Sequence, residues 1–333
     1  MSNVCVLGAG AWGTALAKVL ADKGNPTVLW AFEQDVAQSI NETHENKRYF
    51  SGHTVPDSVR ATTSLEGALQ GAELVVIVVP THAVREVMTK AKPFIPPQAL
   101  LCSAAKGIEN DTLMLMSQVL EDVLGADATP RLTYLSGPSF AKEVALGMPT
   151  AVVVAGRDDE NTKAVQRAFA TDKLRVYSSD DVIGVEIGGA LKNVIAIAAS
   201  AIDGLGFGHN SRAGMITRGL HEIGRLAMRM GGDPMTVAGL SGMGDLVLTC
   251  TGDLSRNRTV GVELGKGKKL PEILAALGAV AEGVKTAKSA YDLSVREKVE
   301  MPITHEVYKV LYEGKHPRQA VVDIMNRELR SER

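Results

Sequence analysis

The chain of 333 residues is longer than one ordinary hydrophobic core supports, so we expect two domains. Its formal net charge is −2, its pI is about 6.4, and no run of basic residues occurs; because nucleic acids are bound through a basic stripe, this argues against a nucleic-acid partner. Cys5, Cys102 and Cys250 lack metal-ligand spacing, which predicts small buried thiols in a reducing compartment.

The first half of the chain alternates short apolar runs with helix-like stretches. The runs that we expect to form strands are residues 3–7, 27–31, 73–79, 99–105, 131–136 and 150–155. The clearest helix begins at Ala11 and places Trp12, Leu16, Val19 and Leu20 on one face. Alternation of strands and helices predicts a parallel sheet covered by helices.

After about residue 180 the strand-like runs largely disappear and helices follow one another. We expect these helices at residues 181–204, 210–230, 256–265, 271–277, 284–299, 303–313 and 317–329. The pattern predicts an α/β domain at residues 1–179 and an all-helical domain at residues 180–333.

One apolar stretch, residues 182–202, is long enough to be tested as a membrane span. It carries Glu186 and Lys192, and each charge near the centre of a membrane helix costs about 2.5–3.5 kcal/mol. We therefore expect a buried helix. A strand expected from Asn3 leaves no room for a signal peptide, and we expect a cytoplasmic protein.

The segment Gly8-Ala9-Gly10-Ala11-Trp12-Gly13 directly follows the first expected strand and opens a helix. In such a turn the first glycine permits the tight bend, the second lets the backbone approach a pyrophosphate, and the third lets the helix pack on the sheet. Free N–H groups at the helix start suit the phosphates. The sequence thus predicts a Rossmann-type doubly wound α/β domain that binds NAD or NADP, followed by an all-helical domain.

The second strand should end at a residue that contacts the adenosine ribose, and Phe32 and Glu33 stand there. The carboxylate of Glu33 could accept hydrogen bonds from the ribose. It could equally be an acidic residue at the start of a helix, where it favours the helix dipole. The sequence leaves both interpretations open.

Several further segments occur in a characteristic order and spacing. They are GAGAWGTALA at 8–17, SAAKGIE at 103–109, LSGPSFAKEV at 135–144, GVEIGGALKNVIAIA at 184–198, DGLGFG at 203–208, LSGMGDLVLTCT at 240–251, SRNR at 255–258, AEG at 281–283 and MPIT at 301–304. Together they resemble the bacterial NAD(P)-dependent glycerol-3-phosphate dehydrogenases, over nearly the whole chain. The resemblance implies interconversion of sn-glycerol 3-phosphate and dihydroxyacetone phosphate, and a supply of glycerol 3-phosphate for phospholipid synthesis.

The resemblance also implies roles for individual residues. Lys192 would be the catalytic proton donor and acceptor, and a lysine inside an apolar helix is suited to proton transfer. Considered without the motif, the same lysine could instead pack its aliphatic chain in the protein and extend its ammonium group to solvent. The implied substrate contacts are Lys106, Gly137, Ser139, Lys192, Asp245, Ser255, Arg256 and Asn257. The implied cofactor contacts are Gly8, Gly10, Ala11, Trp12, Gly13, Phe32, Glu33, Lys106, Ala141, Arg256, Val280 and Glu282.

Some of these residues have a second, structural interpretation. Ser255-Arg256-Asn257 offers a cation and two hydrogen-bonding side chains for a phosphate, but such a run also suits a capped, solvated helix start. Asn193 could contact substrate or make a structural hydrogen bond. Seven histidines are scattered without metal-ligand spacing, so we expect no metal ion.

The chain departs from the family pattern at the ribose. Basic residues often stand at positions 32 and 33, whereas this chain has Phe32 and Glu33, and Ala11 replaces a common serine. We therefore expect NADH to be accepted and the preference for NADPH to be weaker, unless Lys47 or Arg48 neutralises the 2′-phosphate. A homodimer is implied by resemblance alone.

Two alternatives remain from the sequence. A β-hydroxyacid dehydrogenase has the same domain plan and also uses a lysine, but acts on a carboxylate substrate. A nucleotide-sensing protein would bind the dinucleotide without turnover. The SRNR and GDLVLTCT segments favour the phosphate ester over the first, and Lys192 in its motif argues against the second.

Overall fold

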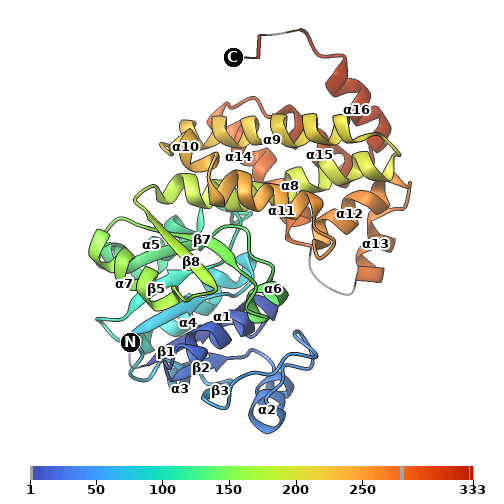
Figure 1. Cartoon of the computed structure of the whole chain (residues 1–333). Coiled ribbons are helices and arrows are strands. Elements are labelled where there is room, and N and C mark those ends of the chain that lie inside the picture. Colours follow the sequence, from blue (N-terminus) through green and yellow to red (C-terminus); the bar gives the residue numbers. More distant parts are fainter. Residues whose placement is uncertain (1–2, 278–280, 330, 333) are drawn as a thin grey trace. The chain divides into compact units, whose positions relative to one another are not determined.

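The computed structural model describes residues 3–277, 281–329 and 331–332, and the chain forms two compact units (Figure 1). The first unit comprises Met1–Glu109 and Met114–Glu186. The second comprises Asn110–Leu113 and Ile187–Arg333.

The first unit is built on an eight-stranded sheet with the order β3-β2-β1-β4-β5-β6-β7-β8. Its strands are β1 (Val4–Leu7), β2 (Thr27–Trp30), β3 (Val59–Thr62), β4 (Leu74–Ile77), β5 (Leu100–Ser103), β6 (Leu132–Ser136), β7 (Thr150–Gly156) and β8 (Leu174–Ser179). Order and connections are those of the doubly wound fold predicted from the sequence.

One strand pair departs from the predicted parallel sheet. β7 runs antiparallel to β6, whereas all other neighbouring strands are parallel. A parallel return needs a crossover that usually contains a full helix. The segment between β6 and β7 holds only the five-residue helix α6 (Ala141–Ala145), so the chain turns back beside β6 instead.

Two strands, β3 and β8, were not predicted. They form the two edges of the sheet, and exposed side chains such as Arg60 and Arg175 alternate with buried ones along them. Strands buried on both faces are continuous apolar runs in the sequence, whereas half-exposed edge strands such as these are not, and they were therefore missed.

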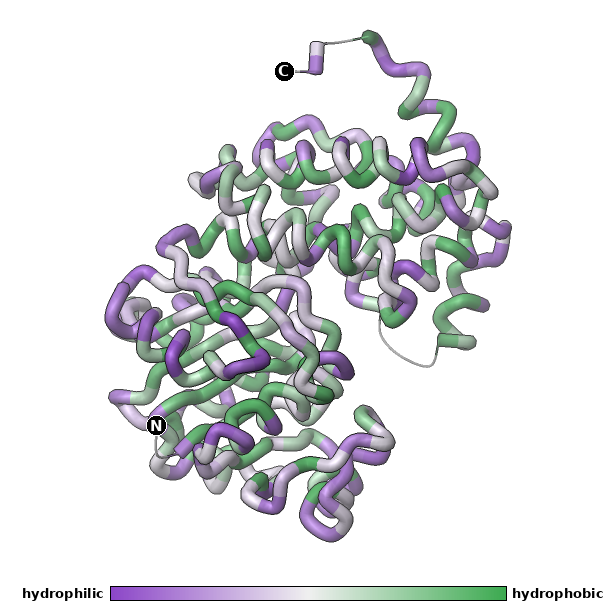
Figure 2. Tube along the Cα trace, in the orientation of Figure 1, coloured by the Kyte–Doolittle hydropathy of each residue, from purple (hydrophilic) through white to green (hydrophobic). Residues whose placement is uncertain are grey.

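Helices cover both faces of the sheet. They are α1 (Ala11–Asp22), α2 (Gln34–Thr43), α3 (Leu65–Leu69), α4 (Val84–Ala91), α5 (Met116–Leu124) and α7 (Asp159–Phe169). In β1 the side chains of Val4 and Val6 pack in one buried cluster, with α1, α2 and α7, while Cys5 and Leu7 pack in the other, with α3, α4 and α5. The central strands accordingly stand out as hydrophobic in Figure 2.

The second unit is helical, as predicted. Its helices are α8 (Val182–Gly204), α9 (His209–Arg229), α10 (Pro234–Val237), α11 (Asp245–Thr251), α12 (Arg256–Gly265), α13 (Leu270–Leu277), α14 (Glu282–Glu297), α15 (Pro302–Tyr312) and α16 (Pro317–Met325). The first residues of α8 are counted with the α/β unit. The sequence missed α10, the π-helical turn Leu240–Gly244 and α11, because glycines interrupt the apolar pattern there.

Helix α8 passes a length-and-composition test for a membrane span, yet 83% of its most apolar window is buried inside the protein. Its side chains are buried on all sides, as expected for a core helix. The three cysteines are buried and unpaired, and burial raises the pKa of the Cys102 and Cys250 thiols to about 12.

Candidate active site

The glycine turn between β1 and α1 has the shape that a pyrophosphate requires. A Cβ at Gly13 would lie 1.8 Å from the Gly8 carbonyl oxygen, and a Cβ at Gly8 would lie 2.9 Å from the Val78 carbonyl carbon. A Cβ at Gly10 would meet nothing within 4 Å. The turn is therefore closed on its protein side and open at Gly10, where a ligand's phosphates can approach the backbone.

Helix α1 begins directly at this opening. Gly10 is its N-cap and supplies no capping side chain, so the first N–H groups of the helix, which start at Ala11 and Trp12, have no acceptor within the helix. Such groups together with the helix dipole favour a bound anion. These residues fit the pyrophosphate of a dinucleotide.

Asn46 braces the turn from a distant part of the chain. It is fully buried, and its Nδ2 lies 2.8 Å from both the Ala9 carbonyl oxygen and Thr14 Oγ1. Its Oδ1 accepts from the Tyr49 backbone N–H at 3.1 Å. Sequence reasoning missed Asn46, because nothing in a single sequence connects it with a turn 37 residues away.

The end of β2 carries the two residues expected at the ribose. Phe32 is 80% exposed. Glu33 is the N-cap of α2, but its carboxylate does not cap the helix. Oε1 of Glu33 instead accepts a 2.6 Å hydrogen bond from Tyr49 Oη, which raises the pKa of Tyr49 and keeps the phenol as the donor.

A second group of predicted residues follows the carboxyl ends of β5 and β6, which are adjacent and parallel. Lys106 Nζ donates to the Gly137 carbonyl oxygen at 3.1 Å, and Ser139 Oγ donates to the same oxygen at 3.0 Å. Ala141 is the first residue of α6, whose N-cap supplies no side-chain hydrogen bond. The structure thus brings Lys106, Gly137 and Ser139 together at the sheet edge where α/β proteins bind ligands.

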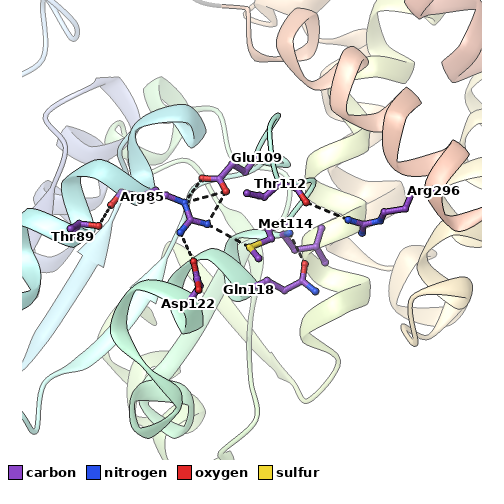
Figure 3. A network of polar contacts seen from close by, with 9 residues as sticks. Arg85, Thr89, Glu109, Thr112, Met114, Gln118, Asp122 and Arg296 are labelled. Carbon is purple, nitrogen blue, oxygen red and sulfur yellow. Dashed lines mark hydrogen bonds and ion pairs between the residues drawn. The ribbon is translucent and has the colours of Figure 1, made fainter.

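The segment after Lys106 is fixed by a polar network (Figure 3). Arg85 binds the Glu109 carboxylate with Nε at 3.0 Å and Nη2 at 2.9 Å, and it also pairs with Asp122. In the helical unit, Arg296 Nη1 donates to the Thr112 carbonyl oxygen at 3.3 Å. These bonds hold the loop that follows the lysine.

The helical unit contains a buried ion pair at the predicted catalytic lysine. Lys192 Nζ lies 2.5 Å from Asp245 Oδ1, and their side chains are 12% and 2% exposed. Lys192 Nζ also donates to Thr249 Oγ1 at 3.2 Å, and Thr249 Oγ1 donates to the Asp245 carbonyl oxygen at 2.6 Å. Sequence reasoning named Lys192 and Asp245 but missed Thr249, which follows Asp245 by one turn of α11.

Backbone contact places the two charges together. A Cβ on Gly188 of α8 would lie 2.9 Å from the Ser241 carbonyl oxygen in the π-helical turn. That turn leads directly into Asp245, the first residue of α11. The glycine thus permits α8 and the turn to approach closely enough for Lys192 and Asp245 to meet.

The start of α12 contains a capping serine, Ser255, and the exposed guanidinium of Arg256. Ser255 is the N-cap and its Oγ accepts from the Arg258 backbone N–H at 3.2 Å. Arg256 is exposed and has no ion pair or hydrogen bond within the described part of the chain. Asn257 Nδ2 donates to Asn193 Oδ1 at 2.8 Å, so Asn193 makes a structural hydrogen bond.

A further predicted cofactor contact, Glu282, lies at the start of α14. Glu282 is its first residue, and the N–H of the next residue, Gly283, donates to Asn257 Oδ1 at 3.0 Å. Val280 lies outside the described residues. Among those residues, no group of three or more His, Cys, Asp or Glu side chains is arranged to hold a metal ion.

Two family models match this chain. The N-terminal model of NAD-dependent glycerol-3-phosphate dehydrogenase matches residues 3–162, and the C-terminal model matches residues 181–322. The chain belongs to this family. This assignment rejects the β-hydroxyacid dehydrogenase, the enzyme alternative that the sequence left open.

Individual relatives agree with this assignment. The chain is 55% identical to glycerol-3-phosphate dehydrogenase [NAD(P)+] of Myxococcus xanthus, over 98% of each chain. It is 54% identical to the enzyme of that name from Geobacter sulfurreducens, over 99% of each chain. The solved glycerol-3-phosphate dehydrogenase of Coxiella burnetii superimposes with a TM-score of 0.93 at 39% identity, covering 98% of this chain and 99% of that chain.

Proposed function

We propose that this protein interconverts sn-glycerol 3-phosphate and dihydroxyacetone phosphate with NAD(P)H. The observation that carries the proposal is the buried group of Lys192, Asp245 and Thr249, in a chain of the glycerol-3-phosphate dehydrogenase family. The nicotinamide supplies the hydride when bound, and the protein must supply the proton that accompanies it.

Lys192 is the proton donor in reduction and the acceptor in oxidation. Its ammonium donates to Asp245 and Thr249, and a third N–H remains for the substrate oxygen. Asp245 balances the buried charge and fixes the direction of the Nζ–H bonds. Thr249 orients both groups, because its hydroxyl links Lys192 to the backbone of α11.

The substrate phosphate requires positive charge in a protein whose net charge is −2. We assign this role to Arg256, with Ser255 and Asn257 as hydrogen-bonding neighbours at the helix start. Arg256 is exposed and unpaired within the described part of the chain, which suits a group that binds an anion. Lys106, Gly137 and Ser139 are further proposed substrate contacts.

The cofactor contacts proposed in the α/β unit are the Gly8–Gly13 turn, Phe32, Glu33, Lys106 and Ala141. Arg256, Val280 and Glu282 complete the set in the helical unit. We thus propose residues 1–179 as the dinucleotide-binding domain and residues 180–333 as the substrate-binding and catalytic domain that carries Lys192, with some contacts to each ligand coming from the other domain. The backbone contacts at Ala11 do not need the serine hydroxyl that is common there.

The proposed biological setting is supported by family membership. We propose that the product supplies glycerol 3-phosphate for phospholipid synthesis, that the protein works in the cytoplasm, and that it forms a homodimer. Light scattering after size-exclusion chromatography tests the last point, and a monomeric mass would reject it.

The test of the proposed function is an absorbance assay at the reduced nicotinamide band. Dihydroxyacetone phosphate is supplied with NADH and NADPH in separate reactions. Unphosphorylated dihydroxyacetone and a 3-oxo carboxylate serve as comparisons. Oxidation that depends on dihydroxyacetone phosphate supports the proposal. Faster turnover of the carboxylate, or binding of the dinucleotide without turnover of any substrate, would reject it.

A further inference from the structure

Four side chains beyond the end of β2 form a charged cluster in the α/β unit: Glu33, Asp35, Arg48 and Tyr49. Arg48 Nη1 lies 3.4 Å from Asp35 Oδ2, and Arg48 Nη2 lies 3.9 Å from Glu33 Oε1. The Arg48 guanidinium carbon lies 5.3 Å from the centre of the Tyr49 ring. Tyr49 in turn donates its hydroxyl to Glu33. We call this the ribose-side cluster.

The charges of this cluster do not balance. Two carboxylates share one guanidinium, so the cluster as a whole carries a net negative charge. Oε2 of Glu33 has no hydrogen-bond partner within the described residues, which leaves an acceptor for a ribose hydroxyl of NAD. A 2′-phosphate brings nearly two further negative charges and would meet the same carboxylate.

We propose that Arg48, through the ribose-side cluster, determines how strongly the protein binds NADPH relative to NADH. The inference rests on the proposed function only in that the dinucleotide lies along the Gly8–Gly13 turn. With NADH, Arg48 stays paired with Asp35 and Glu33. With NADPH, its guanidinium turns from these carboxylates to the 2′-phosphate, and Asp35 and Glu33 compete with that phosphate for the same cation.

Three features favour Arg48 over the neighbouring Lys47. Arg48 already lies beside the residue expected at the ribose, and its planar guanidinium can bind two phosphate oxygens at once. The attraction between the Tyr49 ring and the Arg48 guanidinium keeps that cation beside the ribose-side cluster. Within the described part of the chain, Lys47 has no hydrogen bond or ion pair with Glu33, Asp35 or Tyr49, so nothing holds it at the ribose-side cluster.

The test measures the dissociation constants of NADH and NADPH by the fluorescence of the bound reduced nicotinamide, which needs no turnover. The quantity compared is the NADPH constant divided by the NADH constant, in wild type, Arg48→Gln, Asp35→Asn and Lys47→Gln. Arg48→Gln should raise this ratio at least tenfold. Asp35→Asn releases Arg48 from a competing carboxylate and should lower it several-fold. Lys47→Gln, the matched control, should change it less than twofold.

The proposal is overturned if Arg48→Gln weakens both cofactors equally, or if Lys47→Gln shifts the ratio as much as Arg48→Gln does. A higher ratio in Asp35→Asn would also overturn it. Failure here is separable from failure of the proposed function, because the reduction of dihydroxyacetone phosphate by wild type is measured independently of these binding constants.

Discussion

Removing Lys192 should damage the protein in two separable ways, because the lysine both transfers a proton and neutralises Asp245. The Asp245 side chain is 2% exposed and its Oδ1 lies 2.5 Å from Lys192 Nζ. In Lys192→Met, therefore, a carboxylate stays buried without its counter-charge. In Asp245→Asn, an ammonium stays buried without its counter-charge.

The expected magnitudes follow from this geometry. Breaking a buried ion pair from one side typically costs about 3–5 kcal/mol, whereas replacing both partners by neutral groups is often close to neutral. Each single variant should therefore lose about 3–5 kcal/mol of stability. That loss corresponds to a lower Tm by about 6–20 °C for a domain of this size. Lys192→Met/Asp245→Asn should recover most of the loss.

Activity should behave differently from stability. Loss of a general acid–base group lowers kcat by about 10²–10⁴-fold, and the double variant still lacks that group. We therefore expect kcat to remain low in the double variant although its Tm returns. Recovery of stability without recovery of kcat separates the proton-transfer role from the structural role.

The measurement of Tm has to report the unfolding of the helical unit, which contains Lys192 and Asp245. Both tryptophans, Trp12 and Trp30, lie in the α/β unit, so far-UV circular dichroism is the better probe of helical unfolding. Lys288→Met is the matched control, since Lys288 pairs with Asp292 at 2.7 Å on the exposed face of α14. It should change Tm and kcat far less than Lys192→Met does.

Two results would refute this reasoning. A folded Lys192→Met variant whose kcat falls less than tenfold would show that another group transfers the proton. A double variant that is no more stable than either single variant would show that the two charges do not stabilise one another.

Three further predictions test the phosphate contact, the glycine turn and a buried carboxylate. Arg256→Ala should weaken binding of dihydroxyacetone phosphate by about 1.5–3 kcal/mol, and an equal loss on unphosphorylated dihydroxyacetone would show that Arg256 does not contact the phosphate. Gly13→Ala should lower Tm and weaken NADH binding, because its Cβ would lie 1.8 Å from the Gly8 carbonyl oxygen; normal binding and Tm in this variant would contradict the closed turn. Burial raises the pKa of Glu222 from 4.5 to about 7, so its stabilising contribution should be lost as pH rises through this range. Glu222→Gln should flatten the dependence of Tm on pH between these two pKa values. An unchanged slope would show that Glu222 does not cause this pH dependence.

The local parts of this protein follow from its sequence. The glycine turn could be recognised because strand, glycines and amphipathic helix are contiguous, and each glycine has its own steric reason to be there. The helix that carries Lys192 could be recognised because so long an apolar run in a globular protein is expected to form a buried helix. The catalytic role of Lys192 could be predicted only from the surrounding motif, because a lysine that merely extends its ammonium group to solvent gives the same helical pattern.

The tertiary structure alone decided which side chains meet. Lys192 and Asp245 are 53 residues apart, and they meet where α8 and the π-helical turn approach each other closely at Gly188. The bonds from Asn46 to the glycine turn and from Tyr49 to Glu33 likewise join residues of separate segments. Periodicity describes which face of an element is buried, but not the element packed against it. The charge around Glu33 was therefore decided by the packing of separate segments, whereas the direction of β7 follows from its short connection to β6.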